Sequence, residues 1–265
     1  MKKFLLLSFL ASLSCGVAAQ VPASDGPVEA FRIAQSLLSG LDIPRLKLEN
    51  HPDRAYFQKR IYKGSELSVF ILSSETALNE IENFPIDEFV YYLNGKAEIV
   101  TQEGNALSFY AGDYLFVPKG FSGNWTNNGG NTYHLELSVI SNRRADSTMI
   151  SEAKMPFVLD RALMSGIGLT AIDSATYRDV LYEGVELDVV TEAEKSNKRE
   201  ILNSEKEVFI HVLNGSLTLQ AKNGEANTFY SGDFFVLPKG FTGRWESKGQ
   251  SLLRNMEVIP KRCLV

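Results

Sequence analysis

Histidine and cysteine are both scarce in this chain of 265 residues, which holds three histidines and two cysteines. The histidines lie far apart in the sequence, at His51, His134 and His211. They form no local cluster of the kind that supplies several imidazoles to a metal ion. Cys15 falls in a short apolar leader, so Cys263 has no partner for an intramolecular disulfide in a processed chain. Stability must therefore come from burial of apolar surface.

Long apolar runs are missing after the first nineteen residues. Residues 1–19 combine two lysines, a short apolar run and a small-residue end, a pattern that predicts a secretory signal peptide cleaved before Gln20. Lipidation at Cys15 is the alternative, although Ser12 stands where a lipoprotein signal has Leu or Val. No later segment reaches the roughly 18 consecutive apolar residues of a membrane span. We expect a periplasmic or secreted protein without a membrane span.

The chain also lacks an excess of basic residues. Removal of Lys2 and Lys3 with the leader leaves 27 − 2 = 25 basic residues against 32 acidic ones, a net charge of −7. No basic cluster is present, which argues against a nucleic-acid partner. The sequence has no G-x-S-x-G motif and no cysteine near a histidine, so it offers no motif for a covalent nucleophile. A small molecule is the expected partner.

An internal repeat is the strongest feature that is present. The segment FYAGDYLFVPKGFSGNW at 109–125 recurs 120 residues later as FYSGDFFVLPKGFTGRW at 229–245. Residues 62–125 align with 182–245 without a gap, with 24 identities in 64 pairs. Such self-similarity indicates a duplicated domain. Most identities are glycines, turn residues and aromatics, so the two copies share mainly their architecture.

Both copies consist of short apolar runs bounded by Gly, Asn, Asp and Pro, which predicts many short strands. The pairs Asn94-Gly95 and Asn214-Gly215 are typical of tight hairpin turns. We therefore expect an all-β fold of two sandwiches or barrels. Residues 27–40 place apolar residues at mostly helical spacing, which predicts a short helix packed on the first domain. The expected division is 1–19 signal peptide, 20–44 N-terminal helical segment, 45–142 first barrel, 143–164 linker and 165–265 second barrel.

Two motifs carry a family resemblance. The pattern GD-x4-PKG that begins at Gly112 and again at Gly232 resembles the second motif of the cupins, and Glu88-x6-Gly95 resembles the end of the first motif. The longer pattern GD-x4-PKGF-x-G-x-W is similar to the subfamily of (S)-ureidoglycine aminohydrolase and the ethanolamine-utilisation cupins. The resemblance implies two tandem jelly-roll barrels, over roughly 45–140 and 165–260.

Metal-binding cupins, by the same resemblance, supply two histidines and a glutamate from the first motif and one histidine from the second. The corresponding positions in this chain are Glu82, Phe84, Glu88 and Gly123, and in the second copy Leu202, Ser204, Val208 and Gly243. We therefore expect neither a metal nor another cofactor. An unconventional centre where Glu82, Glu88 and His134 converge in the first barrel is the alternative.

The two barrels differ where a ligand would bind. Because side chains alternate along a strand, Glu88 and Tyr92 should share one face, and Trp125 and Asn127 should share another. The resemblance to the cupins implies that the face with Glu88 is the interior one. A carboxylate inside a barrel is costly unless it has a task or a partner. The second copy places Val208, Ile210, Val212 and Ser247 at Glu88, Val90, Tyr92 and Asn127. We expect a ligand pocket of Glu88, Tyr92, Trp125, Asn127 and His134 in the first barrel, and a mainly structural second barrel.

Three functions remain open. The first is an exported, metal-free two-barrel cupin that binds a small polar molecule, such as a carboxylate, a sugar or a nitrogen metabolite. The second is an enzyme in which Glu88 acts as catalytic acid or base, assisted by Tyr92 and His134, in an isomerisation, epimerisation or hydrolysis. The third is a structural or interaction protein with filled barrels. We expect either a monomer with pseudo-twofold barrels or a homodimer.

Overall fold

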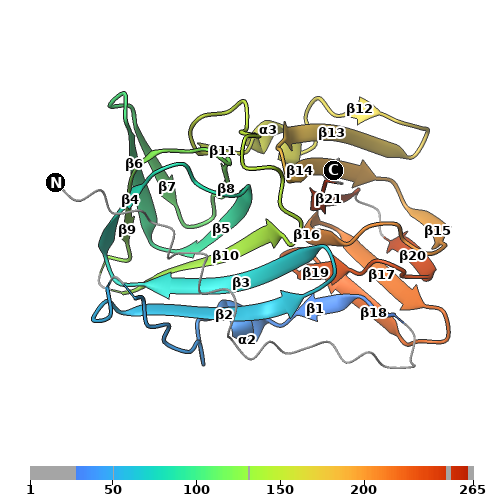
Figure 1. The fold of residues 1–265 in the computed structure, drawn as a ribbon. Coiled ribbons are helices and arrows are strands. Elements are labelled where there is room, and N and C mark those ends of the chain that lie inside the picture. Colours follow the sequence, from blue (N-terminus) through green and yellow to red (C-terminus); the bar gives the residue numbers. More distant parts are fainter. Residues whose placement is uncertain (1–27, 50, 131, 249–251, 262–265) are drawn as a thin grey trace. The chain divides into compact units, whose positions relative to one another are not determined.

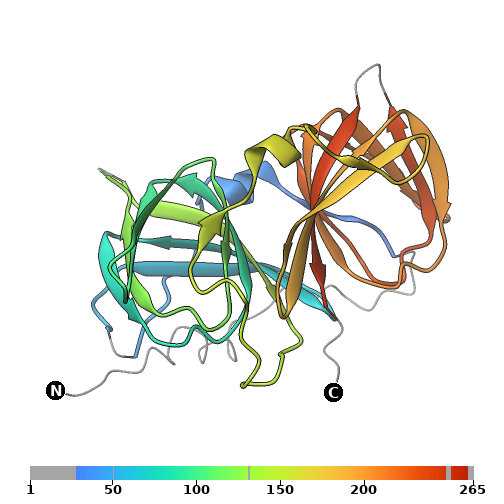
Figure 2. The same ribbon diagram turned by 90° about the horizontal axis from the view of Figure 1, so that it is seen from above.

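The computed structural model describes residues 28–49, 51–130, 132–248 and 252–261. These residues form two compact units. The first unit comprises Ser36–Lys63 and Ser68–Leu159, and the second comprises residues 28–35, Gly64–Leu67 and 160–261. Each unit consists of two antiparallel sheets that curve toward each other (Figure 1, Figure 2).

The larger sheet of the first unit has the strand order β11-β8-β5-β10-β3-β2 and the smaller one the order β4-β9-β6-β7. In chain order the strands are β2 (Tyr56–Lys63), β3 (Leu67–Ser74), β4 (Ala77–Ile81), β5 (Glu88–Asn94), β6 (Lys96–Thr101), β7 (Ala106–Tyr110), β8 (Tyr114–Val117), β9 (Gly123–Asn128), β10 (His134–Ser141) and β11 (Phe157–Val158). Buried side chains of both sheets, among them Val90, Ile99, Phe109 and Phe121, pack into one core.

The second unit repeats this arrangement, with the orders β1-β19-β16-β21-β14-β13-β12 and β15-β20-β17-β18. Its strands are β1 (Phe31–Ile33), β12 (Thr170–Ala171), β13 (Thr176–Glu183), β14 (Leu187–Glu194), β15 (Asn197–Ile201), β16 (Val208–Asn214), β17 (Ser216–Ala221), β18 (Ala226–Tyr230), β19 (Phe234–Leu237), β20 (Gly243–Lys248) and β21 (Leu253–Pro260). Five strands of the larger sheet and all four of the smaller sheet follow the same order in the two units. The fold is all-β, as predicted.

The turns predicted from Asn-Gly lie where expected. Strand β5 ends at Asn94 and β6 begins at Lys96, so Gly95 forms the turn. Its φ of 87° is in the left-handed region, and a Cβ atom would lie 2.7 Å from the carbonyl oxygen of Asn128. Only glycine meets both conditions without strain.

The predicted helix at 27–40 is largely wrong. Only one turn, α2 (Gln35–Leu38), is helical, and Phe31–Ile33 form strand β1. Strand β1 pairs with β19, so this segment completes a sheet of the second unit instead of covering the first. The buried side chain of Ile33 and the ion pair between Arg32 and Asp233 hold it there. Edge pairing satisfies backbone groups of β19 that a helix would leave without partners.

The region 143–164, expected to be a linker, contains a short strand and a short helix. Within it, Phe157 and Val158 form β11, which pairs with β8 of the first unit. The short helix α3 (Arg161–Met164) follows, with Asp160 as its N-cap. Strands β11 and β1 therefore cover equivalent edges, since β8 and β19 occupy the same place in the two sheets.

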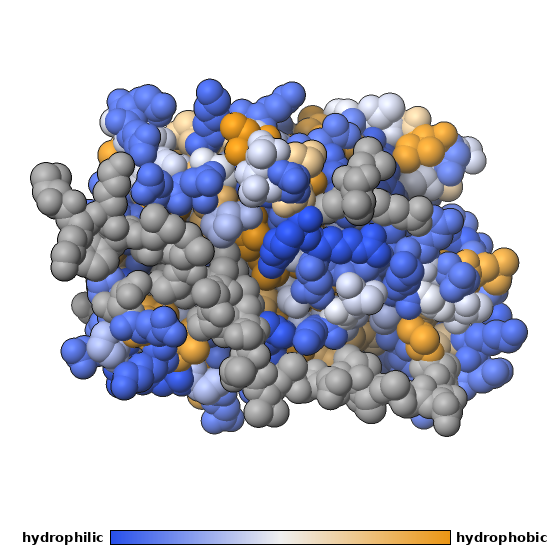
Figure 3. Space-filling model, viewed as in Figure 1, coloured by the Kyte–Doolittle hydropathy of each residue, from blue (hydrophilic) through white to orange (hydrophobic). Residues whose placement is uncertain are grey.

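Polar side chains predominate on the face shown in Figure 3, where hydrophobic residues lie singly or in small groups. Exposed hydrophobic side chains include Leu41, Ile167, Ile172 and Leu202. Isolated exposed residues of this kind are normal for a protein surface. Among the residues that the structure describes, no helix is long and apolar enough to cross a membrane. The expected signal peptide at 1–19 lies outside the described residues.

Candidate functional site

A cavity of about 80 Å³ lies between the two sheets of the first unit. One wall comes from β2, β3, β5 and β10, and the other from β4, β9 and Phe84 in the loop after β4. Apolar groups form most of the lining, with Tyr56, Phe70, Phe84 and Trp125 as its aromatic members. Because roughly 10–15 Å³ suffices for one water molecule, the cavity has room for several waters or a small organic molecule.

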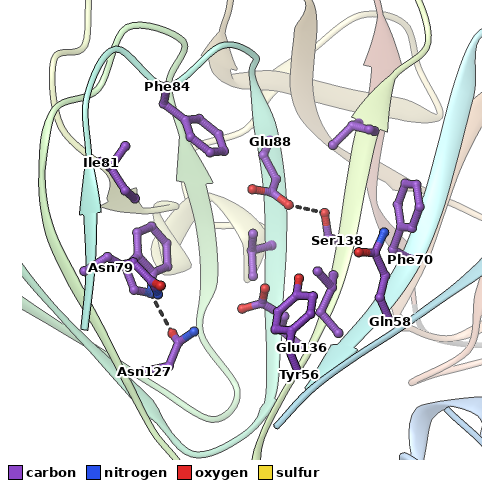
Figure 4. Close-up of a pocket in the computed structure, with 14 residues that line it drawn as sticks. Tyr56, Gln58, Phe70, Asn79, Ile81, Phe84, Glu88, Asn127, Glu136 and Ser138 are labelled. Atoms are coloured by element: carbon purple, nitrogen blue, oxygen red, sulfur yellow. Dashed lines mark hydrogen bonds between the residues drawn. The ribbon is translucent and has the colours of Figure 1, made fainter. Parts of the chain in front are cut away.

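Glu88 lies at this cavity on the first residue of β5 (Figure 4). Its Oε1 accepts a hydrogen bond from the hydroxyl of Ser138 on the neighbouring strand β10. Burial raises the pKa of Glu88 to about 8, and the negative charge of Glu136 adds to the increase. The bond from Ser138 and the positive charge of Arg144 oppose this change. Glu88 is therefore largely protonated at neutral pH.

Glu136 supplies a second carboxyl group to the cavity, from β10. Its Oε2 lies 2.7 Å from Nε2 of His134, and Nδ1 of that histidine lies 3.2 Å from the hydroxyl oxygen of Ser74. An ionised carboxylate only accepts hydrogen bonds, so Nε2 of His134 donates to Glu136. His134 is almost fully buried and holds Glu136 from behind the cavity wall.

Trp125 and Asn127 line the opposite side of the cavity from β9. The indole Nε1 of Trp125 donates to Oδ1 of Asn127 over 2.6 Å, and the hydroxyl of Tyr92 donates to the same oxygen over 3.3 Å. Tyr92 is fully buried behind these residues, next to the ring of His134. Of the five residues expected to form the pocket, Glu88, Trp125 and Asn127 line the cavity, whereas Tyr92 and His134 support it.

Several lining residues were not predicted. Glu136 and Ser138 follow His134 at intervals of two on β10, so the alternation of side chains along a strand would have identified both. Gln58 and Tyr56 on β2 have the same spacing. The position of Asn79 at the cavity could not be predicted in the same way, because it depends on the register of β4 against β9.

The usual metal-binding residues of a cupin do not fit this site. Glu82 is exposed, so it does not converge with Glu88 and His134 as the alternative hypothesis required. Both nitrogen atoms of His134 already have protein partners, Ser74 and Glu136. Among the described residues, no group of three or more His, Cys, Asp or Glu side chains is placed to hold a metal ion.

The interior of the second barrel is charged. The guanidinium group of Arg178 lies 3.3 Å from Glu192 and 3.6 Å from Glu257, and that of Arg199 lies 3.8 Å from Glu192. Trp245, the counterpart of Trp125, donates to Glu194 over 2.8 Å. The face of β16 with Ile210 and Val212 is apolar, as expected, but β14 and β21 bring in carboxylates that the comparison of β16 alone missed.

These carboxyl groups are strongly perturbed. Burial raises the pKa of Glu192 to about 7, with a further increase from Glu257 and a decrease from Arg199 and Arg178. The pKa of Glu257 is raised, mainly by burial. The second barrel thus pairs its carboxyl groups with arginines, and Arg199 on β15 reaches Glu192 on β14 of the facing sheet, whereas the first barrel contains the cavity described above.

Comparison with known proteins agrees with this duplicated architecture. The model of the EutQ-like cupin domain matches residues 79–130 and again residues 183–250, one segment in each unit. Each unit of the chain therefore contains a segment similar to a cupin domain. A search of curated protein sequences found no match.

Several solved structures of other proteins resemble this one at low sequence identity. A protein of unknown function of the DUF861 family from Pseudomonas syringae pv. tomato has a TM-score of 0.63 at 14% identity, covering 88% of this chain and 100% of that one. A putative glyoxylate-induced protein from Pseudomonas aeruginosa has a TM-score of 0.61 at 16% identity, covering 92% and 94%. Salicylate 1,2-dioxygenase from Pseudoaminobacter salicylatoxidans, in a structure with gentisate adducts, has a TM-score of 0.59 at 12% identity, covering 90% and 83%. At these identities the likeness concerns the fold alone.

Proposed function

We propose that this protein is an exported cupin whose first barrel binds a small polar molecule without the help of a metal ion. The observation that carries the proposal is the cavity between the sheets of the first unit, with Glu88 and Glu136 on one wall and Trp125 and Asn127 on the other. Apolar walls with a few converging polar groups are typical of small-molecule sites. Export is predicted from residues 1–19, so the mature protein purified from cells should begin at Gln20.

The comparison of the two barrels supports this assignment. Two carboxyl groups in one barrel interior are costly unless they have partners. In the second barrel arginines provide these partners, as in the pairs of Arg178 with Glu192 and Glu257. In the first barrel the side chain of Glu88 accepts a hydrogen bond from the Ser138 hydroxyl on β10. Within the described residues this is the one hydrogen bond found for that side chain. A bound molecule supplies the missing partner.

The two tryptophans of the chain allow a direct test, because one lies in each barrel. Trp125 lines the cavity, and Trp245 is buried in the second barrel. In a Trp245→Phe variant all indole fluorescence comes from the first barrel. In the matched Trp125→Phe variant all of it comes from the second.

A thermal-shift screen of small amines, alcohols, sugars and carboxylates first identifies a binding compound. We expect that compound to change the emission of the Trp245→Phe protein in a saturable way and to leave the emission of the Trp125→Phe protein unchanged. A change confined to the Trp125→Phe protein places the site in the second barrel and contradicts the proposal. No shift with any compound contradicts it as well.

A second candidate function is acid–base catalysis, and it rests on the different surroundings of the two carboxyl groups. Glu88 holds a proton near neutral pH, while His134 supports Glu136 through a hydrogen bond. A carboxyl group that holds its proton near neutral pH can act as a general acid. The test is to incubate the bound compound with a catalytic amount of protein and follow it by NMR. Conversion that is lost in Glu88→Gln supports an enzyme, and an unchanged compound supports binding alone.

A further inference from the structure

The charges that line the first-barrel cavity are all of one sign. Among its lining residues the acidic groups are Glu88 and Glu136, and the lining includes no Lys, Arg or His. The remaining polar members are neutral: Tyr56, Gln58, Asn79, Asn127 and Ser138. An anionic ligand would meet two carboxyl groups and no cation, which makes binding of a carboxylate or phosphate unfavourable.

The hydrogen bonds that Glu88 and Glu136 make leave carboxyl oxygens of both residues as acceptors for a ligand. Glu88 uses Oε1 for Ser138, and Glu136 uses Oε2 for His134, so each has one further oxygen that these bonds do not use. Figure 4 shows both carboxyl groups directed into the cavity. On the opposite side, Oδ1 of Asn79 accepts from Arg54 and Oδ1 of Asn127 accepts from Trp125. The strongest acceptors offered to a ligand are therefore the carboxyl oxygens.

The aromatic walls favour the same kind of ligand. Tyr56, Phe70, Phe84 and Trp125 surround the cavity, and the faces of aromatic rings attract cations, most strongly where water is excluded. A cation between the two carboxyls also lowers the cost of keeping both of them ionised in a buried place.

We propose that the first-barrel cavity selects a small organic ammonium ion, which binds between Glu88 and Glu136 and displaces the proton that Glu88 holds in the empty protein. This inference rests on the proposed function and names its ligand class. The exchange conserves charge: one ammonium ion enters, Glu88 becomes a carboxylate, and one proton passes to the solvent.

The groups around Glu88 fit such an exchange. Strand β10 contributes Glu136 and Ser138, strand β2 contributes Tyr56, and Arg144 follows β10. From β4 and β9 the lining groups Asn79, Trp125 and Asn127 are neutral. Burial and Glu136 keep the pKa of Glu88 at about 8, so the proton is present at neutral pH when no ligand is bound. Arg144 alone among these groups is a cation.

The test uses three probes of the same size that differ in charge: propylammonium, n-propanol and propionate. Isothermal titration with the full mature protein should show binding of propylammonium in preference to the other two. Because protons compete with propylammonium for Glu88, the affinity of the protein for propylammonium should be weaker by roughly a hundredfold at pH 6 than at pH 9. Titrations in two buffers with different ionisation enthalpies should show release of about one proton per ligand at pH 6 and almost none at pH 9.

Variants connect the exchange to Glu88. In Glu88→Gln the proton release should disappear and propylammonium should bind more weakly, whereas n-propanol should bind as well as before. Glu80→Gln is the matched control, because Glu80 is on the exposed face of β4 and should leave binding unchanged.

The outcomes separate this inference from the proposed function. Preferential binding of n-propanol or propionate in the first barrel supports a small-molecule site and overturns the ammonium assignment. Binding of propylammonium without proton release overturns the exchange. Failure of all three probes to bind overturns the inference, and failure of the wider compound screen overturns the proposed function with it.

Discussion

Glu88 is a residue at which the two copies differ in chemistry. Its counterpart in the second copy is Val208, which packs against the apolar core of that barrel. Where the second barrel has a methyl group, the first has a carboxyl group that burial keeps protonated at neutral pH. A residue that destabilises its own barrel when ionised is explained more readily by a ligand than by packing.

Glu88→Gln should therefore stabilise the protein at alkaline pH. The folded-state pKa of about 8 lies above the ordinary value of 4.5, so below pH 4.5 both states hold the proton and Glu88 costs nothing. As the pH rises from 4.5 to 8 the unfolded state loses its proton first, and stability falls until the full cost is reached above pH 8. Glutamine has no such cost, and the gain should be small near pH 5 and about 2 kcal/mol near pH 9, allowing for partial exposure.

Urea unfolding of both proteins near pH 5, 7 and 9 measures this gain. Glu80→Gln serves as the control for loss of an exposed carboxylate from the same unit, and its stability should follow that of the wild type. A difference between Glu88→Gln and the wild type that is equal at all three pH values would show that ionisation of Glu88 is not its cause.

At the scale of the strand, β14 and β21 decide what fills the second barrel. They place Glu192 and Glu257 in the interior, and β13 and β15 bring Arg178 and Arg199 to meet them. The guanidinium group of Arg178 bridges the two carboxylates, and Glu192 has Arg199 as a second partner.

Arg178→Met should weaken the second barrel, and more so at higher pH. Loss of the guanidinium leaves Glu257 and Glu192 buried with less compensation, which should cost about 2–3 kcal/mol near pH 8, since Arg178 is partly exposed. Near pH 5 the cost should be smaller, because carboxyls whose pKa is already raised take up protons once the cation is gone. Unfolding followed by the fluorescence of Trp245 in a Trp125→Phe background measures both values. Lys248→Met, which removes an exposed ion pair with Glu246, is the control, and equal losses at both pH values would contradict the explanation.

How far the sequence predicts each element depends on whether the deciding contacts are local. The hairpin at Asn94-Gly95 was predictable because the two residues themselves determine the turn. Alternation along a single strand predicted which residues share a face with Glu88, and the resemblance to the cupins implied that this face is the interior one. Strand β1 was not predictable in this way. Its apolar residues have helical spacing, and its strand conformation depends on pairing with β19, some 200 residues further along the chain. The ion pairs of Arg178 and Glu257 depend equally on register between distant strands.

At the scale of the whole molecule, duplication has preserved the strand order and changed the interiors. The two units share the order of nine strands, yet one encloses a cavity with two carboxyl groups and the other pairs its interior carboxylates with arginines. One copy can thus keep a ligand site while the other is free to become structural, since function resides in the site and not in the fold.

The N-terminal segment that forms β1 should stabilise the second unit. Because residues before the first barrel form β1 in the second unit, a protein that starts at residue 36 should lose stability mainly in the second unit. The loss includes the burial of Ile33 and the ion pair of Arg32 with Asp233, together about 2–4 kcal/mol. A protein that starts at residue 28 keeps β1 and is the control. Urea unfolding should show the larger decrease with Trp245 as reporter, in a Trp125→Phe background, and the smaller one with Trp125, in a Trp245→Phe background. An equal or larger decrease at Trp125 would instead assign the N-terminal segment to the first barrel, where its helical spacing had placed it.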